Sequence, residues 1–267
     1  MTAATEFAPA KINLALHVTG QQANGYHLLD SLVVFADVGD VLSVLPAERM
    51  SLTVDGPFSS GVPEDARNLV WKALDRAGVT AEVSLTKNLP HGAGIGGGSS
   101  DAAAILRAIG RPDLAPGLGA DVPVCLGQGP QRMQGIGDVL TDIPTCPRFW
   151  LVLVNPGAHV PTVDVFGALI RKDNPPMDSL PTKGDWLAWL AAQRNDLQDP
   201  AIAYAPVISE ALAALEDAQL ARMSGSGSTC FGIYPDKDAA SAAQTRISAS
   251  RPDWWVVATQ TFGAEIS

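Results

Sequence analysis

The chain has 267 residues, of which 46% are hydrophobic and 17% charged, so the composition excludes a disordered chain and the length predicts one large or two smaller domains. It carries 18 lysines and arginines against 28 aspartates and glutamates, which gives a net charge of −10. Nucleic-acid-binding proteins usually carry a basic surface, so we expect no nucleic-acid partner, whereas a small anionic ligand held by backbone N–H groups is compatible with this charge.

Cysteine spacing and hydropathy exclude several further classes. Cys125, Cys146 and Cys230 include no CxxC pair, so we expect neither a disulfide framework nor a zinc site. No run approaches the roughly 18 apolar residues that a membrane helix needs. The N-terminal sequence MTAATEFAPAK lacks the basic start and apolar stretch of a signal peptide. We therefore expect a cytoplasmic protein with no membrane contact.

The predicted strands and helices mix along the chain without a strict βαβ rhythm. From Lys11 to Val18, apolar side chains occupy every second position, which is the period of a half-buried strand. Further strands are expected at 31–36, 41–45, 81–86, 149–154, 229–234 and 255–262. Helices are expected at 68–77, 99–109, 162–171, 185–193, 206–217 and 236–248. This mixture favours an α+β fold over a doubly wound sheet.

Two proline-rich stretches organise the chain. The segment TDIPTCPR, residues 141–148, precedes the apolar run FWLVLV and predicts a boundary between an N-terminal domain, 1–147, and a C-terminal domain, 148–267. The polar segment KDNPPMDSLPTKGD, residues 172–185, is expected to form a surface loop inside the second domain.

The glycine-rich segment LPHGAGIGGGSSDAAAILRAI, residues 89–109, carries the strongest functional signal. It follows a β-patterned run, has five glycines from Gly92 to Gly98, and opens an alanine-rich helix at Ser99 and Ser100. Glycine lets the backbone approach a ligand closely, and the start of a helix offers unpaired N–H groups. The segment therefore predicts a phosphate-binding loop. A tight strand-to-helix turn without a ligand is the alternative.

Other nucleotide-binding loops fit this segment less well. No lysine follows the glycines, as a P-loop requires, and no HRD or DFG element of a protein kinase occurs in the chain. The dinucleotide pattern GxGxxG matches Gly92, Gly94 and Gly97, but the region about 20 residues on does not end a strand with an acidic residue. A dinucleotide-dependent oxidoreductase and a non-catalytic nucleotide-binding protein are alternatives that the loop alone leaves open.

Three blocks resemble the GHMP kinases, the superfamily of galactokinase, homoserine kinase, mevalonate kinase and phosphomevalonate kinase. The loop PxGxGxGGGSSxAA at 90–103 resembles their ATP loop, PAKINLAL at 9–16 resembles their first strand block, and MSGSGSTCFGIY at 223–234 resembles their C-terminal glycine block. The resemblance spans nearly the whole chain, and the order of the blocks makes it specific. It implies two domains in an α+β fold, one like the second domain of ribosomal protein S5 and carrying the ATP loop, the other ferredoxin-like.

Three longer matches point to one branch of this superfamily. PAKINLALHVTGQQANGYH at 9–27, GADVPVCL at 119–126 and PGAHVPTVDVF at 156–166 resemble the kinases that phosphorylate 4-diphosphocytidyl-2-C-methyl-D-erythritol in the non-mevalonate isoprenoid pathway. The resemblance implies transfer of the ATP γ-phosphoryl group to the C2 hydroxyl of this small molecule, with Mg²⁺, whose ligands the sequence leaves unknown. The alternative is another GHMP kinase, of the homoserine or mevalonate type.

The resemblance assigns Asp121 as the catalytic base and Lys11 as its partner. A carboxylate can accept the proton of the acceptor hydroxyl, and an ammonium group close by favours the charged carboxylate. From the residues alone, Lys11 could be a solvated strand residue and Asp121 a helix cap. The family normally has a longer helical segment before Asp121, whereas this chain has only residues 110–118, so we expect a shorter connection and lower stability.

The resemblance also assigns a nucleotide site to the glycine-rich loop and to two further blocks, NLV at 68–70 and TKNLP at 86–90, which match family positions near the adenine. Asn68 could instead be only a helix cap. The assigned residues are Pro90, His91, Gly92, Ala93, Gly94, Ile95, Gly96, Gly97, Gly98, Ser99, Ser100, Asn68 and Lys87.

For the substrate, the resemblance places cytosine at Tyr26 and His27, with Phe166 as a second aromatic wall. Tyr26 could instead flank a turn within a core, and Phe166 shares a helical stripe with Val163 and Ile170 that is typical of core. The remaining candidate substrate residues are Asn13, Thr162, and Gly225, Ser226 and Gly227 of the SGSGS segment, which could form a second anion site. Thr162 could instead cap its helix, and the SGSGS segment could be a plain turn before a strand rather than an anion site. The sequence does not determine the oligomeric state.

Overall fold

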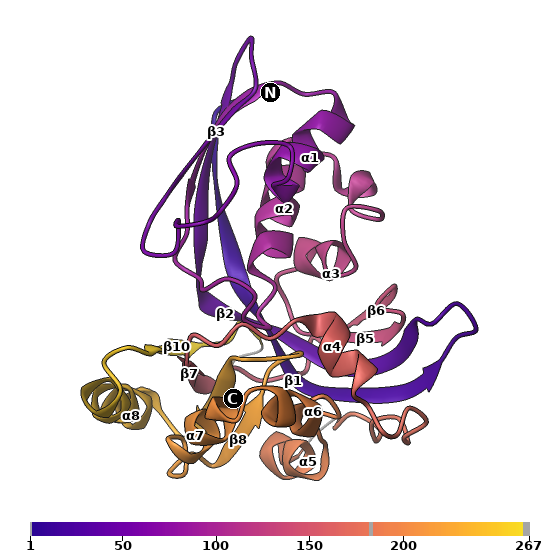
Figure 1. Ribbon diagram of the computed structural model, residues 1–267, viewed down its shortest axis with the longest axis vertical. Helices are drawn as coiled ribbons and strands as arrows, with labels where there is room; N and C mark the ends of the chain where they lie inside the picture. Colours follow the sequence, from indigo (N-terminus) through magenta and orange to yellow (C-terminus); the bar gives the residue numbers. More distant parts are fainter. Residues whose placement is uncertain (1, 182–183, 264–267) are drawn as a thin grey trace. The chain divides into compact units, whose positions relative to one another are not determined.

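The computed structural model describes residues 2–181 and 184–263, which form an α+β fold with two β-sheets (Figure 1). This confirms the predicted fold class. The elements are β1 (Ala4–Gln21), β2 (His27–Pro46), β3 (Ser51–Asp55), α1 (Leu69–Ala77), β4 (Ala81–Thr86), α2 (Gly97–Ala108), the 3₁₀ turn η1 (Pro112–Leu114), α3 (Val122–Leu126), β5 (Gln131–Gly135), β6 (Val139–Asp142), β7 (Trp150–Asn155), α4 (Thr162–Gly167), α5 (Trp186–Ala192), α6 (Gln198–Tyr204), α7 (Val207–Ala213), β8 (Leu220–Met223), β9 (Cys230–Tyr234), α8 (Lys237–Ser250) and β10 (Trp255–Gln260).

The chain divides into two compact units that are interleaved along the sequence. Within the described residues, unit 1 contains 2–11, 38–91 and 96–128, and unit 2 contains 12–37, 92–95 and 129–263. Strands β1 and β2 and the glycine-rich loop therefore each contribute residues to both units. The predicted division after residue 147 stays a prediction.

The two long N-terminal strands differ from the sequence expectation. β1 extends beyond the predicted 11–18 in both directions, and β2 unites the predicted strands 31–36 and 41–45. The polar residues between these two apolar runs suggested a break. Pairing with β1 continues the strand, because backbone hydrogen bonding does not depend on the side chains.

Unit 1 holds the start of the alanine-rich helix in place. β3 pairs in parallel with β4, which pairs antiparallel with the second half of β2. Helix α2 packs against both α1 and α3 (Figure 1). Ala102, Ala103 and Ala104 of α2 are fully buried, and their small side chains allow close helix packing. This packing fixes the axis of α2 and thus the direction of its N-terminus.

Unit 2 contains an antiparallel sheet in the order β10-β7-β9-β8, with α8 packed against β7, β9 and β10 (Figure 1). Apolar side chains of β7, β9, α7 and α8 form a single core with Leu16 and Val18 of β1. Burying these side chains is the main stabilising contribution to the unit. It also anchors the turn between β8 and β9, where the SGSGS segment lies.

The predicted surface loop 172–185 has no helix or strand in its described part, and residues 182–183 lie outside the described residues. Asp30 holds the loop: its Oδ2 accepts from the Met177 amide at 2.9 Å and from Arg132 Nη2 at 2.6 Å. Met177 is buried, so the loop is not exposed along its whole length.

Arg222 of β8 is buried and bonds only to backbone carbonyls among its described contacts. Its Nη1 donates to Leu14 O at 2.7 Å, and its Nη2 donates to Leu190 O at 2.9 Å and to Gln193 O at 2.7 Å. Arg222→Met would leave these three oxygens without their donor, so we expect the free energy of unfolding in urea to fall by about 3 kcal/mol. Arg171→Met, which removes an exposed ion pair, is the matched control and should change little. Equal effects of the two substitutions would contradict this role of Arg222.

Candidate active site

An ion pair joins Lys11 of β1 to Asp121, the residue that precedes α3. Lys11 Nζ lies 2.9 Å from Asp121 Oδ2, and the lysine side chain is 5% exposed against 38% for the aspartate. Asp121 makes no capping hydrogen bond to α3, so the helix-cap interpretation is wrong, as is that of a solvated strand lysine. The pair combines a buried ammonium group with an accessible carboxylate, which suits removal of a proton from a substrate hydroxyl.

The N-terminus of α2 lies beside this ion pair within unit 1. Its N-cap residue, Gly96, has φ +65° and no side chain caps the helix. A Cβ atom at Gly96 would lie 3.2 Å from Lys11 Cβ and Cε, so the loop backbone packs directly against the lysine. An uncapped helix start offers N–H donors and the positive end of the helix dipole to an anion. Unit 1 thus places an uncapped helix start, which suits an anion, next to the Lys11–Asp121 pair.

The first half of the glycine-rich loop, in unit 2, is supported by the turn at residues 224–228. Ser224 Oγ donates to Gly94 O at 3.1 Å, and the Thr229 amide donates to Ala93 O at 3.1 Å. Gly94 has φ +71°, and a Cβ atom there would lie only 2.5 Å from Ser224 O. The turn therefore does more than lead into β9, because it holds the loop. An anion site at the turn stays a prediction.

Exposure varies along the loop and its flanks. The buried residues are Pro90, Ala93, Ile95 and Ser100, and the exposed ones are His91, Gly92 and Gly98. Ser100 Oγ donates to Pro9 O at 2.9 Å, which ties the first turn of α2 to β1. Gly98 is therefore better placed to meet a ligand than the buried loop residues are.

Asn13 of β1 has an open acceptor. Its backbone N–H donates to Ser224 Oγ at 3.1 Å, and its side-chain Nδ2 donates to Ser31 Oγ at 2.8 Å. Its Oδ1 is buried and has no hydrogen-bond partner among the described residues. Buried polar atoms are nearly always paired, so an open oxygen calls for a water or a ligand. This agrees with the predicted substrate contact, which stays a prediction.

An aromatic pair lies in unit 2. The rings of His27 and Phe166 stack with centroids 4.8 Å apart and an angle of 27°. Burial, with a smaller contribution from Lys172, lowers the pKa of His27, which favours the neutral imidazole at pH 7. His27 Nε2 is buried without a described partner, whereas Tyr26 is 60% exposed, so Tyr26 is no core residue. The pair presents a ring face and an open ring nitrogen, which suits a planar heterocycle.

Helix α4 corrects two sequence interpretations. It ends before Ile170, and both Val163 and Ile170 are exposed, so the predicted core stripe is wrong at these two positions, whereas Phe166 is partly buried and packs against the core of unit 2. Thr162 lies within α4 rather than at its N-cap, so it does not cap the helix. Thr162 Oγ1 instead lies 2.8 Å from Ser226 Oγ, which brings two of the predicted substrate residues together.

Comparison with known proteins places the chain in a family. It matches the family models for the GHMP kinases N terminal domain over residues 67–126 and the GHMP kinases C terminal domain over residues 177–253. A 4-diphosphocytidyl-2-C-methyl-D-erythritol kinase of Jannaschia sp. (strain CCS1) is 52% identical to it over 271 residues, covering 96% of this chain and 97% of that protein. The chain belongs to the 4-diphosphocytidyl-2-C-methyl-D-erythritol kinase family of GHMP kinases.

Solved structures agree with the family assignment. A crystal structure of 4-(cytidine 5'-diphospho)-2C-methyl-D-erythritol kinase is 31% identical with a TM-score of 0.79, covering 98% of this chain and 100% of that one. Homoserine kinase from Cytophaga hutchinsonii ATCC 33406 is 14% identical with a TM-score of 0.66, covering 98% and 95%, and shares the fold alone. The GHMP kinase fold is confirmed, and the chain is a kinase for which the family implies ATP as phosphate donor. The oxidoreductase and non-catalytic interpretations are wrong.

Two residues that the family resemblance assigns to ATP are engaged within the protein. Asn68 caps α1, since its Oδ1 accepts from the Val70 amide at 2.9 Å while its Nδ2 donates to a backbone carbonyl at 2.8 Å. Lys87 Nζ donates to Asp101 Oδ2 at 2.7 Å and to Asp40 Oδ2. The helix-cap interpretation of Asn68 is confirmed, and contact of either residue with ATP stays a prediction.

The sequence analysis did not identify the two aspartates that bind Lys87, nor the serine that accepts a hydrogen bond from Asn13 Nδ2. Asp40, Asp101 and Ser31 are buried. Asp101 lies in the first turn of the predicted helix 99–109, and Asp40 lies between the predicted strands 31–36 and 41–45. An acidic residue amid apolar sequence is the available signal, but it does not reveal the partner.

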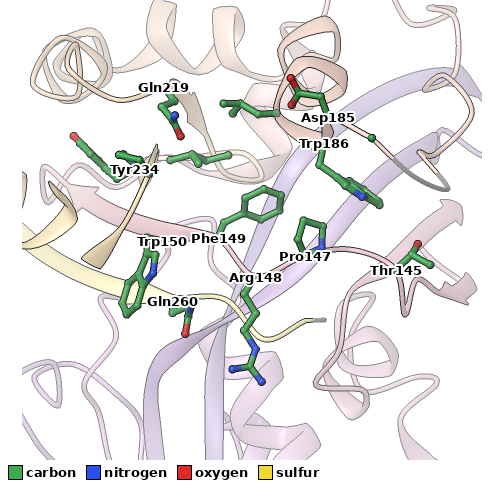
Figure 2. Close-up of a pocket in the computed structure, with 14 residues that line it drawn as sticks. Thr145, Pro147, Arg148, Phe149, Trp150, Asp185, Trp186, Gln219, Tyr234 and Gln260 are labelled. Carbon is green, nitrogen blue, oxygen red and sulfur yellow. The ribbon is translucent and has the colours of Figure 1, made fainter. Parts of the chain in front are cut away.

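A cavity of about 800 Å³ lies elsewhere in unit 2 (Figure 2). Aromatic side chains line it: Phe149, which precedes β7, Trp150 of β7, Trp186 of α5 and Tyr234 of β9. None of the predicted site residues lines it. The cavity therefore has no part in the site described above.

Proposed function

We propose that the chain transfers the γ-phosphoryl group of ATP to the C2 hydroxyl of 4-diphosphocytidyl-2-C-methyl-D-erythritol, a step of the non-mevalonate isoprenoid pathway. Membership of the family supports this reaction. The observation that carries it is the Lys11–Asp121 ion pair beside the uncapped N-terminus of α2. A proton acceptor and an anion-binding helix start in one unit supply what phosphoryl transfer to an alcohol requires.

In the proposed reaction, Asp121 takes the proton of the C2 hydroxyl as its oxygen bonds to the γ-phosphorus. The bond from the γ-phosphorus to the β,γ-bridging oxygen breaks, and its electron pair leaves with ADP. Lys11 holds the Asp121 carboxylate in place and offsets charge around the reacting oxygen. The amides at the start of α2 hold the phosphate oxygens.

Substrate choice is proposed to rest on unit 2. Phe166 and His27 supply a stacking surface, the exposed Tyr26 adds a third ring, and a neutral His27 can form a hydrogen bond with the edge of cytosine. Thr162 and Ser226 offer hydroxyl groups for the diphosphate end, and Asn13 an amide oxygen. Gly225 and Gly227 have positive φ and are buried, so the turn is proposed to meet the diphosphate through Ser226, which is partly exposed.

Mg²⁺ belongs to this proposal as the ion that offsets phosphate charge when ATP binds. The described residues contain no group of three or more histidines, cysteines, aspartates or glutamates arranged to hold a metal, so this part of the chain offers no preformed set of metal ligands. Mg²⁺ commonly binds through substrate phosphates with few protein ligands, which fits this finding. No helix in the described ranges is both long and apolar enough to span a bilayer, and the cytoplasmic location stays a prediction.

The direct test is ADP release with a panel of acceptors at fixed ATP. We expect turnover with 4-diphosphocytidyl-2-C-methyl-D-erythritol and little with 2-C-methyl-D-erythritol 4-phosphate, homoserine or mevalonate. Turnover with the acceptor that lacks the cytidyl group would refute the proposed base site. Turnover with homoserine or mevalonate alone would favour the alternative GHMP kinase activity.

Phe166→Ala tests the base site separately from the chemistry. Loss of the stacking surface should raise the KM for the cytidyl substrate about tenfold, as removal of about 1.4 kcal/mol of stacking energy would. The kcat and the KM for ATP should change little, as steady-state kinetics would show. Val163→Ala, at an exposed position of the same helix, is the control. An unchanged KM for the cytidyl substrate in Phe166→Ala would exclude stacking there.

A further inference from the structure

Three buried ionisable side chains meet behind the second half of the glycine-rich loop. Asp40, Lys87 and Asp101 are 0%, 3% and 3% exposed. The single ammonium group of Lys87 donates to a carboxyl oxygen of both aspartates. A Cβ atom at Gly97, the first residue of α2, would lie 3.5 Å from Lys87 Nζ and 3.6 Å from Asp40 Oδ2. These three residues, here called the Asp–Lys–Asp cluster, therefore lie directly against the helix start that is proposed to bind phosphate.

The cluster connects the two ends of this loop. Asp40 Oδ1 accepts from the amides of Asn88 at 2.6 Å and Leu89 at 2.9 Å, where the loop begins. Lys87 then links Asp40 to Asp101, which belongs to α2, where the loop ends. Two buried contacts through one side chain thus set the distance between the entry and exit of the loop.

The charges of the cluster do not balance if both acids are ionised. One cation faces two carboxyl groups, and an uncompensated charge buried this deeply is costly. Asp40 accepts three hydrogen bonds, whereas Asp101 accepts one and its Oδ1 is buried without a described partner. The better-bonded Asp40 is the stable carboxylate, so Asp101 is the group that accommodates a proton.

We propose that the Asp–Lys–Asp cluster is a positioning device for the glycine-rich loop in which Asp101 carries a proton, so that the cluster is neutral where ATP's phosphates bind. The inference rests on the proposed function only in taking this loop as the ATP site. Loss of that proton places a negative charge behind the loop and weakens ATP binding.

No other described charge packed against α2 supplies the missing balance. The charged residues of α1 are exposed, and Asp113 of η1 is exposed and paired with Arg111. On α3, burial raises the pKa of the Cys125 thiol to about 12, so it is neutral, and Arg107 of α2 itself is paired with Glu6. The start of α3 adds Asp121, whose charge is opposed by Lys11. The exposed charged residues of α1 are Lys72, Asp75 and Arg76.

Electrostatics agree with this geometry. Burial raises the pKa of Asp101 to about 8, with Asp40 adding to the rise and Lys87 opposing it. Between its unfolded pKa of 3.8 and about 8, the folded protein holds a proton that the unfolded chain has released. Stability from this proton is therefore lost as pH rises through that interval.

The test compares the full chain with its Asp101→Asn variant, since asparagine keeps the shape and lacks the titration. Calorimetric titration with ADP, which needs no acceptor substrate, is run at about pH 7 and about pH 9.5. We expect the Kd of the unmodified chain to rise about fivefold more between these pH values than that of the variant, from one added charge at intermediate distance. Asp75→Asn, at an exposed position of α1, is the control and should keep the pH dependence. Equal pH dependence in Asp101→Asn and the unmodified chain would overturn the proposal.

A direct readout is the infrared C=O band of a protonated carboxyl group near neutral pH. The band should be present in the unmodified chain and absent from Asp101→Asn. If that variant fails to fold, Asp40→Asn provides the test: its amide oxygen can still accept from Asn88 and Leu89, and one acid then faces one cation, so Asp101 should ionise and the band should vanish. A band that persists in Asp40→Asn, or that Asp101→Asn does not remove, would overturn the proposal.

These measurements separate the proposal from the proposed reaction. The infrared band and the pH dependence of unfolding need neither ATP nor an acceptor. From about pH 5 to about pH 8, the free energy of unfolding should fall more steeply with rising pH in the unmodified chain than in Asp101→Asn. A band together with no turnover on the cytidyl substrate would refute the reaction and retain the proton. Turnover on the cytidyl substrate without the band would support the reaction and refute the proton on Asp101. Lys87→Arg should retain a lower KM for ATP than Lys87→Met, as a positioning role requires.

Discussion

Asp121→Asn is expected to lower kcat by about a thousandfold, because proton acceptance by a positioned side chain typically contributes 10²–10⁴ to rate. Asparagine has nearly the shape of aspartate but cannot take the hydroxyl proton. Since the Asp121 side chain is 38% exposed and caps no helix, the fold should be unaffected. The KM values for both substrates should change little, which steady-state ADP release measures.

Two comparisons make this result specific. Asp253→Asn, at an exposed position, should behave like the unmodified chain. Lys11→Met should lose activity to a similar degree, and the double variant with Asp121→Asn should lose less than the product of the two single effects, since the residues act as a pair. Near-normal turnover in Asp121→Asn would mean that another group accepts the proton.

Gly94→Ala is expected to have the largest effect among substitutions in the glycine-rich loop. Its φ of +71° is strained for alanine, and the new Cβ would lie 2.5 Å from the backbone oxygen of Ser224. Because the obstructing atom belongs to the backbone, the loop or the turn must move, and we expect the free energy of unfolding to fall by about 3 kcal/mol. The Kd for ADP should also rise, because the turn no longer supports the loop.

Gly129→Ala is the control for this substitution. A Cβ atom there has no heavy atom within 4 Å, and the residue lies outside the left-handed region. Its unfolding midpoint and ADP affinity should match those of the unmodified chain. If Gly94→Ala unfolds at the same denaturant concentration as the control, then the contact between loop and turn does not stabilise the protein.

Local pattern was enough to predict many of the elements. The predicted strands 81–86, 149–154 and 229–234 correspond to β4, β7 and β9, and the predicted helices 68–77, 99–109 and 236–248 correspond to α1, α2 and α8. Short elements such as β3, β6 and α6 were not predicted, because a few residues carry too little periodicity and depend on neighbours for their hydrogen bonds. The break expected within β2 is absent because pairing with β1 continues the strand.

The candidate site divides in a similar way. The glycine pattern identified the loop, and the Lys11–Asp121 contact followed from the family resemblance. The predicted core stripe failed at Val163 and Ile170 because α4 ends before Ile170 and leaves Val163 in solvent. Helical spacing shows which residues share a face, but only the surrounding structure shows what that face meets.

The amino-acid sequence by itself determined many of the segments that extend or coil, and which types of chemical group lie beside them, because these properties depend largely on near neighbours in the chain. Only the tertiary structure decided that one ammonium serves two carboxyl groups 47 and 14 positions away along the chain, and that the imidazole of His27 stacks on Phe166. These long-range contacts depend on burial and charge balance in three dimensions, which no local sequence pattern encodes.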